Sequence, residues 1–427
     1  MSQLHIWTVV AVWACSYGLF AVRAQQHQVF DRQIKSLIVS VGDDLKRPPI
    51  IRMGEGEQVE IAFDEMSHDY RRLAYRVEHC EADWQVSDQL MESDYLTGPA
   101  DDLLLPSVTQ SMNTAVLYTH YAVKLPNTEI GIHLSGNYRV TIYDEENGDA
   151  SHPLAYAYFS VAESLAQPAI TISANTDKEW NGRYQQVSAR VNFSNLTAVN
   201  HPGRQLKLCV LQNFDWSTAV WPAPMAVLPT SLDWQHCADL IFPAGNEYRK
   251  VELLDVNVPT MGVDSIRHRG GFHHLYLYTD APRKNYVYDE DQDGGFVFRQ
   301  TGSNVSTECE YVKVHFALRM PPCQGGQIII DGRWRSAGAG AEPCVMTYQN
   351  ARQQYEATLL LKQGYYNYRY LFVPDGDMDA NLTVESFKPV EGNYFQTENQ
   401  YTALVYFREI GGRTDRLVGW ADAYSQP

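Results

Sequence analysis

A histidine and a cysteine stand side by side at His79 and Cys80, with Asp83 three residues further on. These are the residue types of a cysteine nucleophile, because a thiolate needs a neighbouring base to take its proton. Adjacent residues of a strand point to opposite faces, however, so His79 is badly placed to serve Cys80. We therefore expect a packing or disulfide role for these residues. The chain also carries no G-x-S-x-G elbow, no H-E-x-x-H motif and no phosphate-cradling glycine loop, and we predict that it is not an enzyme.

Two acidic stretches resemble the start of a calcium-binding loop. Their carboxylates alternate along the chain at Asp289, Asp291 and Asp293 in the first stretch and at Asp375, Asp377 and Asp379 in the second. An EF-hand loop takes a bidentate Glu at about its twelfth position. Counted from Asp289, that position is Gln300, and no helical period flanks the loop. Hydrated turns are the favoured interpretation, with a looser calcium site at Asp289 to Asp293 left open.

Three histidines, His268, His273 and His274, flank a Gly-Gly pair. They offer imidazole donors of the kind that zinc accepts, but no Cys or acidic residue follows at ligand spacing. A solvated loop is the favoured interpretation. We predict no metal, cofactor or catalytic residues for this chain.

A further candidate is Asp331-Gly332-Arg333-Trp334, followed by a long strand and by the aromatic run 364–368. This layout resembles that of glycogen- or starch-binding sandwich modules, in which exposed Trp and Tyr stack on sugar faces. Aromatic-rich strands are more often packing elements. Carbohydrate binding is therefore kept as the alternative function.

The segments that carry these residues are predicted to be β-strands. Apolar and polar residues alternate with period two, for example at Val59, Ile61 and Phe63, and again at Tyr138, Val140 and Ile142. Such alternation indicates strands with one buried and one wet face, as in antiparallel sandwiches. Because Gly and Asn turns separate the strands and no long helical period intervenes, we predict an all-β fold of tandem, immunoglobulin-like antiparallel β-sandwich domains.

The length of 427 residues exceeds what a single core normally supports, so several domains are expected. Composition shifts place the boundaries near Gln167-Pro168 and in the small, polar stretch 301–307. We predict a signal peptide at 1–24, an N-terminal sandwich at 25–163, a middle sandwich at 168–306 and a C-terminal sandwich at 308–427.

The formal net charge of −17 argues against nucleic acid as a partner, since phosphates demand a basic face. Residues 6–22 are mostly apolar, and small residues around Ala24 suit a signal peptidase, although the segment before them has no Lys or Arg. A membrane anchor is the rival interpretation, but the run is interrupted at Ser16 and is short for a span of about 20 residues. After Ala24 no apolar run approaches that length, so we predict a secreted chain without a membrane span.

Six cysteines follow the expected signal peptide: Cys80, Cys209, Cys237, Cys309, Cys323 and Cys344. An oxidising compartment permits disulfides, but six cysteines are too sparse to be the framework of so long a chain. We hypothesise pairs between Cys323 and Cys344 and between Cys209 and Cys237, because each pair lies within one expected domain. No C-x-x-C spacing supports zinc as the rival use.

The C-terminal block contains three specific stretches: 359–370 (LLLKQGYYNYRY), 391–401 (EGNYFQTENQY) and 404–408 (LVYFR). The N-terminal third contains shorter motifs. In order along the chain they are Phe63-Asp64, 79–84 (HCEADW), 95–98 (YLTG), 111–114 (SMNT), Tyr121, Pro126-Asn127 and 135–138 (SGNY). In the residues, order and spacing of these motifs the chain resembles the type IX secretion system plug proteins of Bacteroidetes-type bacteria.

The resemblance implies a function without chemistry. Members of this family are periplasmic proteins that associate with the large outer-membrane β-barrel translocon and close its periplasmic opening when no substrate passes. We therefore expect a non-enzymatic plug in the periplasm whose partner is that translocon. The sequence does not indicate which surface docks.

Overall fold

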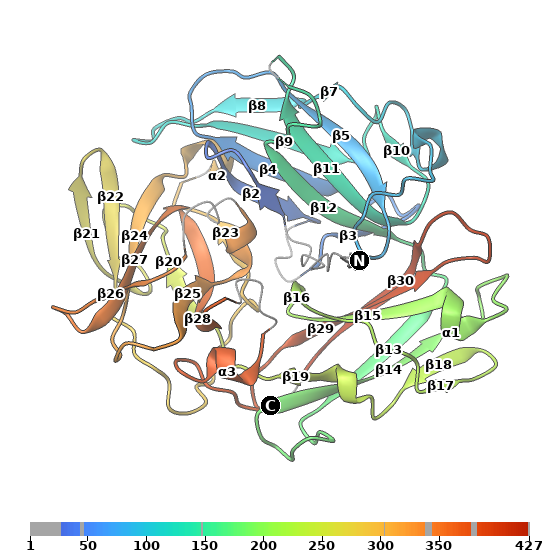
Figure 1. Ribbon diagram of the computed structural model, residues 1–427. Coiled ribbons are helices and arrows are strands. Elements are labelled where there is room, and N and C mark those ends of the chain that lie inside the picture. Colours follow the sequence, from blue (N-terminus) through green and yellow to red (C-terminus); the bar gives the residue numbers. More distant parts are fainter. Residues whose placement is uncertain are drawn as a thin grey trace, which may run out of the picture.

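The computed structural model describes residues 27–42, 47–146, 148–302, 304–337, 344–376 and 382–425. The expected signal peptide at 1–24 lies outside these described residues. The described part folds into three β-sandwiches arranged around a common centre (Figure 1). This confirms the predicted class of tandem β-sandwiches, in which most strand pairs are antiparallel and the β3–β12 and β22–β24 pairs are parallel.

The first sandwich comprises the strands between residues 27 and 163. One sheet has the order β1 (Gln28–Val29), β12 (Ala155–Ala162), β11 (Gly136–Asp144), β5 (Leu73–Cys80) and β7 (Leu103–Leu104), with β3 (Ile50–Arg52) beside β12. The facing sheet has the order β2 (Ile34–Ser40), β4 (Val59–Glu65), β9 (Thr119–Leu125) and β8 (Ser107–Gln110). The short pair β6 (Leu96–Thr97) and β10 (Gly131–Ile132) and the 3-10 turn η1 (Glu92–Asp94) complete it.

The second sandwich is built from two segments that lie far apart in the sequence. One sheet has the order β13 (Gln167–Ser173), β14 (Tyr184–Asn192), β18 (Ser231–Trp234) and β17 (Ala226–Val227), with β19 (Ile241–Pro243) beside β14. The other has the order β16 (Asp215–Val220), β15 (Leu206–Gln212), β29 (Gln400–Phe407) and β30 (Arg416–Tyr424). Short helical turns are α1 (Pro202–Gln205) and η2 (Ala238–Leu240).

The third sandwich occupies the chain between these two segments. One sheet has the order β20 (Arg249–Glu252), β28 (Gly364–Pro374) and β23 (Phe296–Phe298), with β25 (Gly326–Asp331) also beside β28. The other has the order β21 (Val263–Arg269), β22 (Phe272–Leu277), β24 (Tyr311–Leu318), β27 (Gln354–Lys362) and β26 (Thr347–Gln349). Its helical turns are α2 (Val305–Glu308), η3 (Arg333–Ala337) and α3 (Val384–Phe387).

The observed sheets exchange segments between the expected middle range 168–306 and the expected C-terminal range 308–427. Strands β20 to β23 belong to the third sandwich, whereas the terminal hairpin β29–β30 returns to the second, where Leu206 opposes Phe407. The physical reason is that alternation shows which face of a strand is buried but not which strand pairs with it. Each sandwich nevertheless has its own apolar core.

The cores follow the alternation that the sequence predicts. In β4, for example, Val59, Ile61 and Phe63 are almost fully buried in the first core. Successive residues of a strand point to opposite faces, so the residues between them are directed to the other side of the sheet. Asp64, the residue after Phe63, is directed to that other side as well, and it is buried against the third sandwich.

Candidate functional site

The first and third sandwiches meet around a buried ion pair. Lys362 Nζ lies 2.6 Å from Asp64 Oδ2, and the two side chains are 2% and 1% exposed. Tyr311 donates a hydrogen bond to the same oxygen at 2.7 Å. Burial acts to raise the pKa of Asp64, but the Lys362 charge and the contact with His120 outweigh it and hold the pKa below its usual range. This carboxylate is therefore charged and compensated inside the interface.

The first and second sandwiches meet through a second set of polar contacts. Arg408 on the loop after β29 is paired with Glu81, and the backbone N–H of Asp415 donates to the same carboxylate at 2.9 Å. Arg416 and Glu163 form a further pair at 2.5 Å, and Tyr406 donates to the Asn137 side chain at 3.0 Å. The terminal hairpin is thus attached to both the second and the first sandwich.

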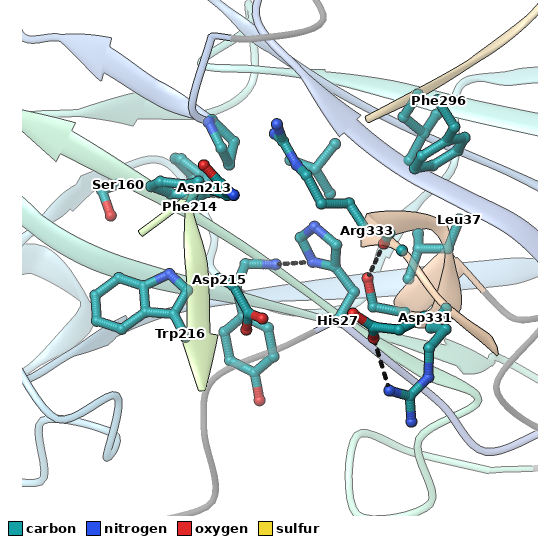
Figure 2. Close-up of a pocket in the computed structure, with 18 of the residues that line it drawn as sticks. His27, Leu37, Ser160, Asn213, Phe214, Asp215, Trp216, Phe296, Asp331 and Arg333 are labelled. Carbon is teal, nitrogen blue, oxygen red and sulfur yellow. Dashed lines mark hydrogen bonds and ion pairs between the residues drawn. The ribbon is translucent and has the colours of Figure 1, made fainter. Parts of the chain in front are cut away.

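The three sandwiches line a partly open cavity of about 130 Å³ at their common centre, which we call the junction cavity. Figure 2 shows Trp216 of the second sandwich, His27 of the first and Arg333 of the third around this space. Burial, followed by the charge of Arg333, lowers the pKa of His27 to about 4, so this imidazole is neutral at physiological pH. Its Nδ1 accepts a hydrogen bond from the Tyr158 backbone N–H at 3.2 Å.

The positive charges of the junction cavity are unequally compensated. Asp331 accepts from Arg335 at 2.9 Å and from Arg369 at 2.8 Å, and Asp215 lies 3.9 Å from Arg369. Burial acts to raise the pKa of Asp331, but the two guanidinium groups lower it overall. Arg333 has no ion pair among the described residues. Asp293 and Asp215 nevertheless act electrostatically on Arg333, so acidic groups accompany all three arginines of the cavity.

His79 and Cys80 do not form a catalytic pair. Cys80 is fully buried, and burial raises the pKa of its thiol to about 12. His79 instead lies within hydrogen-bonding distance of the Ser87 hydroxyl at 2.9 Å and of the Ser135 carbonyl at 3.2 Å. A thiol that does not ionise near neutral pH is a poor nucleophile. His79 thus contacts other partners than Cys80, in line with the strand alternation from which a packing or disulfide role was predicted.

Residues 34–163, which comprise the first sandwich from β2 onwards, match the model of the type 9 secretion system plug protein 1st domain. A crystal structure of a hypothetical protein from Parabacteroides merdae is 36% identical in sequence, covers 93% of this chain and 99% of its own, and superimposes with a TM-score of 0.87. No curated protein matches the chain.

The chain belongs to the type 9 secretion system plug family. This membership confirms the resemblance drawn from the sequence and connects the protein to type 9 secretion. Two residues of these motifs contact another sandwich: Asp64 pairs with Lys362 inside one interface, and the partly exposed Glu81 pairs with Arg408 at the other. Two stretches of the plug protein that lie hundreds of residues apart thus meet in the structure.

The acidic loop of this plug-family protein uses its carboxylates within the protein. Asp289 pairs with Lys250 at 2.5 Å, and Asp291 accepts the backbone N–H groups of Tyr248 at 2.5 Å and of Asp293 at 2.6 Å. Burial, with the nearby Asp293 charge, raises the pKa of Asp291 to about 8. The described residues contain no group of three or more potential metal ligands. Asp377 and Asp379 of the second acidic stretch lie outside the described residues.

The three histidines predicted to lie together belong to two separate contacts on the third sandwich of the plug protein. His268 and His273 face each other across β21 and β22 with ring centroids 4.9 Å apart. His274 lies 2.8 Å from His315 on β24. His273 and His274 are successive strand residues and therefore point to opposite faces, so the sequence cluster does not gather in space.

The aromatic residues that resemble a sugar platform are core residues in the plug protein. Trp334 is 1% exposed and donates its indole N–H to the Asn367 carbonyl at 2.7 Å. Tyr366 and Tyr368 of β28 are also buried in the third core. Sugar stacking needs an exposed ring face, so this layout gives no support to carbohydrate binding.

The two hypothesised disulfides are wrong. Cys209, Cys237 and Cys323 carry free thiols. In β15 the residues beside Cys209 point into the core of the second sandwich, where Cys237 lies, whereas Cys209 points to the opposite face of the sheet. Pairing by expected domain did not take account of the strand face that each cysteine occupies.

Sequence reasoning missed the junction cavity as a site. The sequence analysis included Arg333 in the motif that resembles a sugar platform and Trp84 in a motif of the family. Arg369 stood in the family stretch 359–370, and Trp216 was not singled out at all. These residues come from three sandwiches, and no spacing along the chain brings them together. The only available signal was their type, since Arg and Trp are unusual cavity residues when buried.

Proposed function

We propose that this chain is a non-enzymatic periplasmic plug that binds the outer-membrane β-barrel translocon of the type IX secretion system and closes its periplasmic opening. The observation that carries the proposal is the match of residues 34–163 to the plug family's first domain. The likeness over 93% of the chain to one solved structure of a hypothetical protein adds that the three sandwiches occur together in a second protein.

The geometry supports a plug that acts by shape. A wide, water-filled barrel would let small solutes cross the outer membrane, and a folded body seated in its opening would stop that flow. Domains of one chain usually move relative to one another unless their interfaces are extensive. Here one interface contains the buried ion pair of Asp64 with Lys362, and the other contains the partly exposed pair of Glu163 with Arg416, and both pairs favour one fixed arrangement.

The proposal requires no chemistry from the protein. The one nucleophile candidate that the sequence offered, Cys80, is buried with a strongly raised pKa and has His79 turned toward other partners. Within the described part of the chain no helix is both long enough and apolar enough to cross a membrane. A periplasmic location, reached through the expected signal peptide at 1–24, completes the proposal.

Co-purification from the native host tests this function. The tagged full-length protein is recovered from membranes solubilised in a mild detergent, and its partners are identified by mass spectrometry. We expect a large outer-membrane β-barrel to be recovered in near-stoichiometric amount, and to be absent when the same tag is carried by an unrelated periplasmic protein. Repeated recovery of the chain without any outer-membrane barrel would contradict the proposal.

A further inference from the structure

The sheet that contains β21, β22 and β24 has a core face and an outward face. Leu275 of β22 is buried in the third core, so the next residue along the strand, His274, points outward. Opposed residues of neighbouring strands lie on the same face, and His274 is opposed by Arg267 of β21 and by Lys313 of β24. The residues that we call the cationic face are the outward Arg267, Arg269, Phe272, Tyr276, Lys313 and His315.

Aromatic rings, rather than carboxylates, hold the cations of this face. The Arg267 guanidinium lies 5.3 Å from the centre of the Tyr276 ring, and Lys313 Nζ lies 4.2 Å from the centre of the Phe272 ring. Arg267, Arg269 and Lys313 form no ion pair with any described residue. A cation–π contact orients a cation without neutralising its charge. Positive charge therefore remains available here, although the whole chain has a formal net charge of −17.

The ring that orients Arg267 is fixed from its other side. Tyr276 and His315 are stacked, with ring centroids 4.3 Å apart and ring planes at 7°. The nitrogens of His315 are engaged as well, Nε2 with His274 Nδ1 at 2.8 Å and Nδ1 with the Thr358 hydroxyl at 2.9 Å. Because β21 and β24 lie on opposite sides of β22, Arg267 and His315 approach Tyr276 from its two sides. The ring leaves little room for a base or a sugar to stack, and what the face presents to a partner is charge.

The nearest acids of the sheet do not cancel this charge. Glu356 of β27 is already paired with Arg352 at 2.8 Å. Asp264 lies three residues before Arg267 on β21, which corresponds to about 10 Å along a strand. It forms no ion pair with that arginine in the described ranges. The cationic face can therefore accept carboxylates from another molecule.

The strand that carries the two arginines lies at the edge of its sheet. β21 pairs with β22 on one side, regularly from Ser265 to Arg269, and no strand of the described chain pairs with its other side. Figure 1 shows β21 at the outer margin of the third sandwich, on the side away from the second sandwich. An edge strand presents unpaired backbone N–H and C=O groups that an extended peptide can bind as an additional strand. Every second side chain of such a peptide would lie on the face of Arg267 and Arg269.

We propose that the free edge of β21 and the cationic face bind an extended acidic polypeptide segment, which adds as a strand beside β21 and places alternate carboxylates near Arg267 and Arg269. Backbone hydrogen bonds would supply the affinity, and the two arginines would select acidic side chains. Opposite charges on neighbouring strands stabilise the pairing of those strands. The inference goes beyond the plug function and does not depend on it.

Fluorescence anisotropy on the purified protein tests the proposal with a labelled peptide of about eight residues that alternates Glu and Thr. A peptide that alternates Glu and Pro has the same charge but lacks the backbone donors of a strand, and one that alternates Lys and Thr has the opposite charge. At about 0.15 M salt, which screens exposed charges, the Glu-Thr peptide should bind at least about tenfold more tightly than either control.

Three results would overturn the proposal. They are equal binding of the Glu-Pro peptide, absence of Glu-Thr binding at about 1 mM, and binding of anionic phospholipid vesicles or of a single-stranded oligonucleotide in preference to the Glu-Thr peptide. The bound Glu-Thr peptide should also slow amide hydrogen exchange in β21, because it protects the edge of that strand. Unchanged exchange in β21 at saturating peptide would contradict strand addition.

Removal of the two arginines locates the binding. Arg267→Gln combined with Arg269→Gln should weaken Glu-Thr binding by at least about tenfold, because two charged donors are lost. Both side chains are exposed, so the variant should fold. The matched control removes two exposed arginines of other sandwiches, Arg183→Gln with Arg413→Gln, and should bind as the wild type does. Unchanged affinity in the first variant, or an equal loss in the control, would overturn the assignment.

Discussion

Lys362 at the end of β27 lies 2.6 Å from Asp64 on β4, although 298 residues separate them in the chain. The contact joins the third sandwich to the family's first domain. Lys362 Nζ also lies 4.5 Å from the centre of the Tyr118 ring, on the first-sandwich side. A charged pair removed so completely from water is sensitive to the loss of either partner, because the remaining charge has nowhere to be solvated.

Replacement of Lys362 by Met should therefore destabilise the protein by roughly 3–5 kcal/mol. The reason is that Asp64 would remain buried without its cation. The measurement is urea unfolding of the purified protein. Lys388→Met at the exposed pair with Glu385 is the control, with an expected change within about 0.5 kcal/mol. A Lys362→Met variant as stable as this control would show that the interface is not formed in solution.

The pH dependence of stability should report on Glu247, which lies between β19 and β20. Burial raises the pKa of this carboxyl from 4.5 to about 7, while its Oε1 accepts hydrogen bonds from Tyr286 at 2.7 Å and from the Glu398 N–H at 3.1 Å. Between those pH values the folded state keeps a proton that the unfolded state has lost. The contribution of Glu247 to the free energy of unfolding therefore falls as pH rises from about 4.5 to about 7, and it stays constant above that pH.

Glu247→Gln keeps the accepting oxygen and removes the titration. The variant should gain stability relative to wild type over that pH range, by an amount on the order of a few kcal/mol at pH 8. Chemical unfolding of both proteins at several pH values gives the difference directly. If the free energy of unfolding had the same pH dependence in the two proteins, Glu247 would be ionised in the folded state, contrary to this prediction.

Gly136→Ala should disrupt the first sandwich. Gly136 opens β11 with a φ of +146°, and a Cβ there would lie 2.2 Å from His79 Nε2. Because His79 is fixed by Ser87 and Ser135, the ring has little room to move. We expect a loss of stability roughly 1–3 kcal/mol greater than that of Gly270→Ala, where a Cβ meets nothing within 4 Å. Equal melting temperatures for the two variants would contradict this packing.

Thiol chemistry should distinguish the cysteines of the native protein. Burial raises the pKa of all three thiols, but Cys323 is only partly buried, whereas Cys80 and Cys209 are fully buried. Brief alkylation followed by peptide mass spectrometry should modify Cys323 first and the other two only after denaturation. Early modification of Cys80 would revive the nucleophile interpretation. Cys80→Ala should keep the ability to co-purify with the barrel.

The strands were predictable from the sequence because each sandwich buries one face of each strand. The alternation at Val59, Ile61 and Phe63 gave the position and the inward face of β4 correctly. The pairing of β15 with β29 was not predictable, since Leu206 and Phe407 carry no mutual signal. The pairing of Cys209 with Cys237 failed for another reason: both residues lie in the second sandwich, but Cys209 points away from the core that contains Cys237.

The candidate site was predictable only in part. The expectation that His79 does not serve Cys80 rested on strand geometry, and in the structure His79 contacts Ser87 and Ser135 instead. It placed Arg333 and Trp334 together on an expected sugar platform, whereas Trp334 is a core residue and Arg333 lines the junction cavity. A cavity made by three sandwiches exists only after they have assembled, so no local pattern encodes it.

The central claim is that this protein closes the translocon by its shape, and the most direct test is the permeability of the outer membrane in the native host. Cells lacking the chain but retaining the barrel should take up a hydrophilic solute that is too large for ordinary porins. Expression of the wild-type chain or of the Cys80→Ala variant should restore exclusion of the solute. Unchanged exclusion in cells that lack the chain and still assemble the barrel would contradict the account.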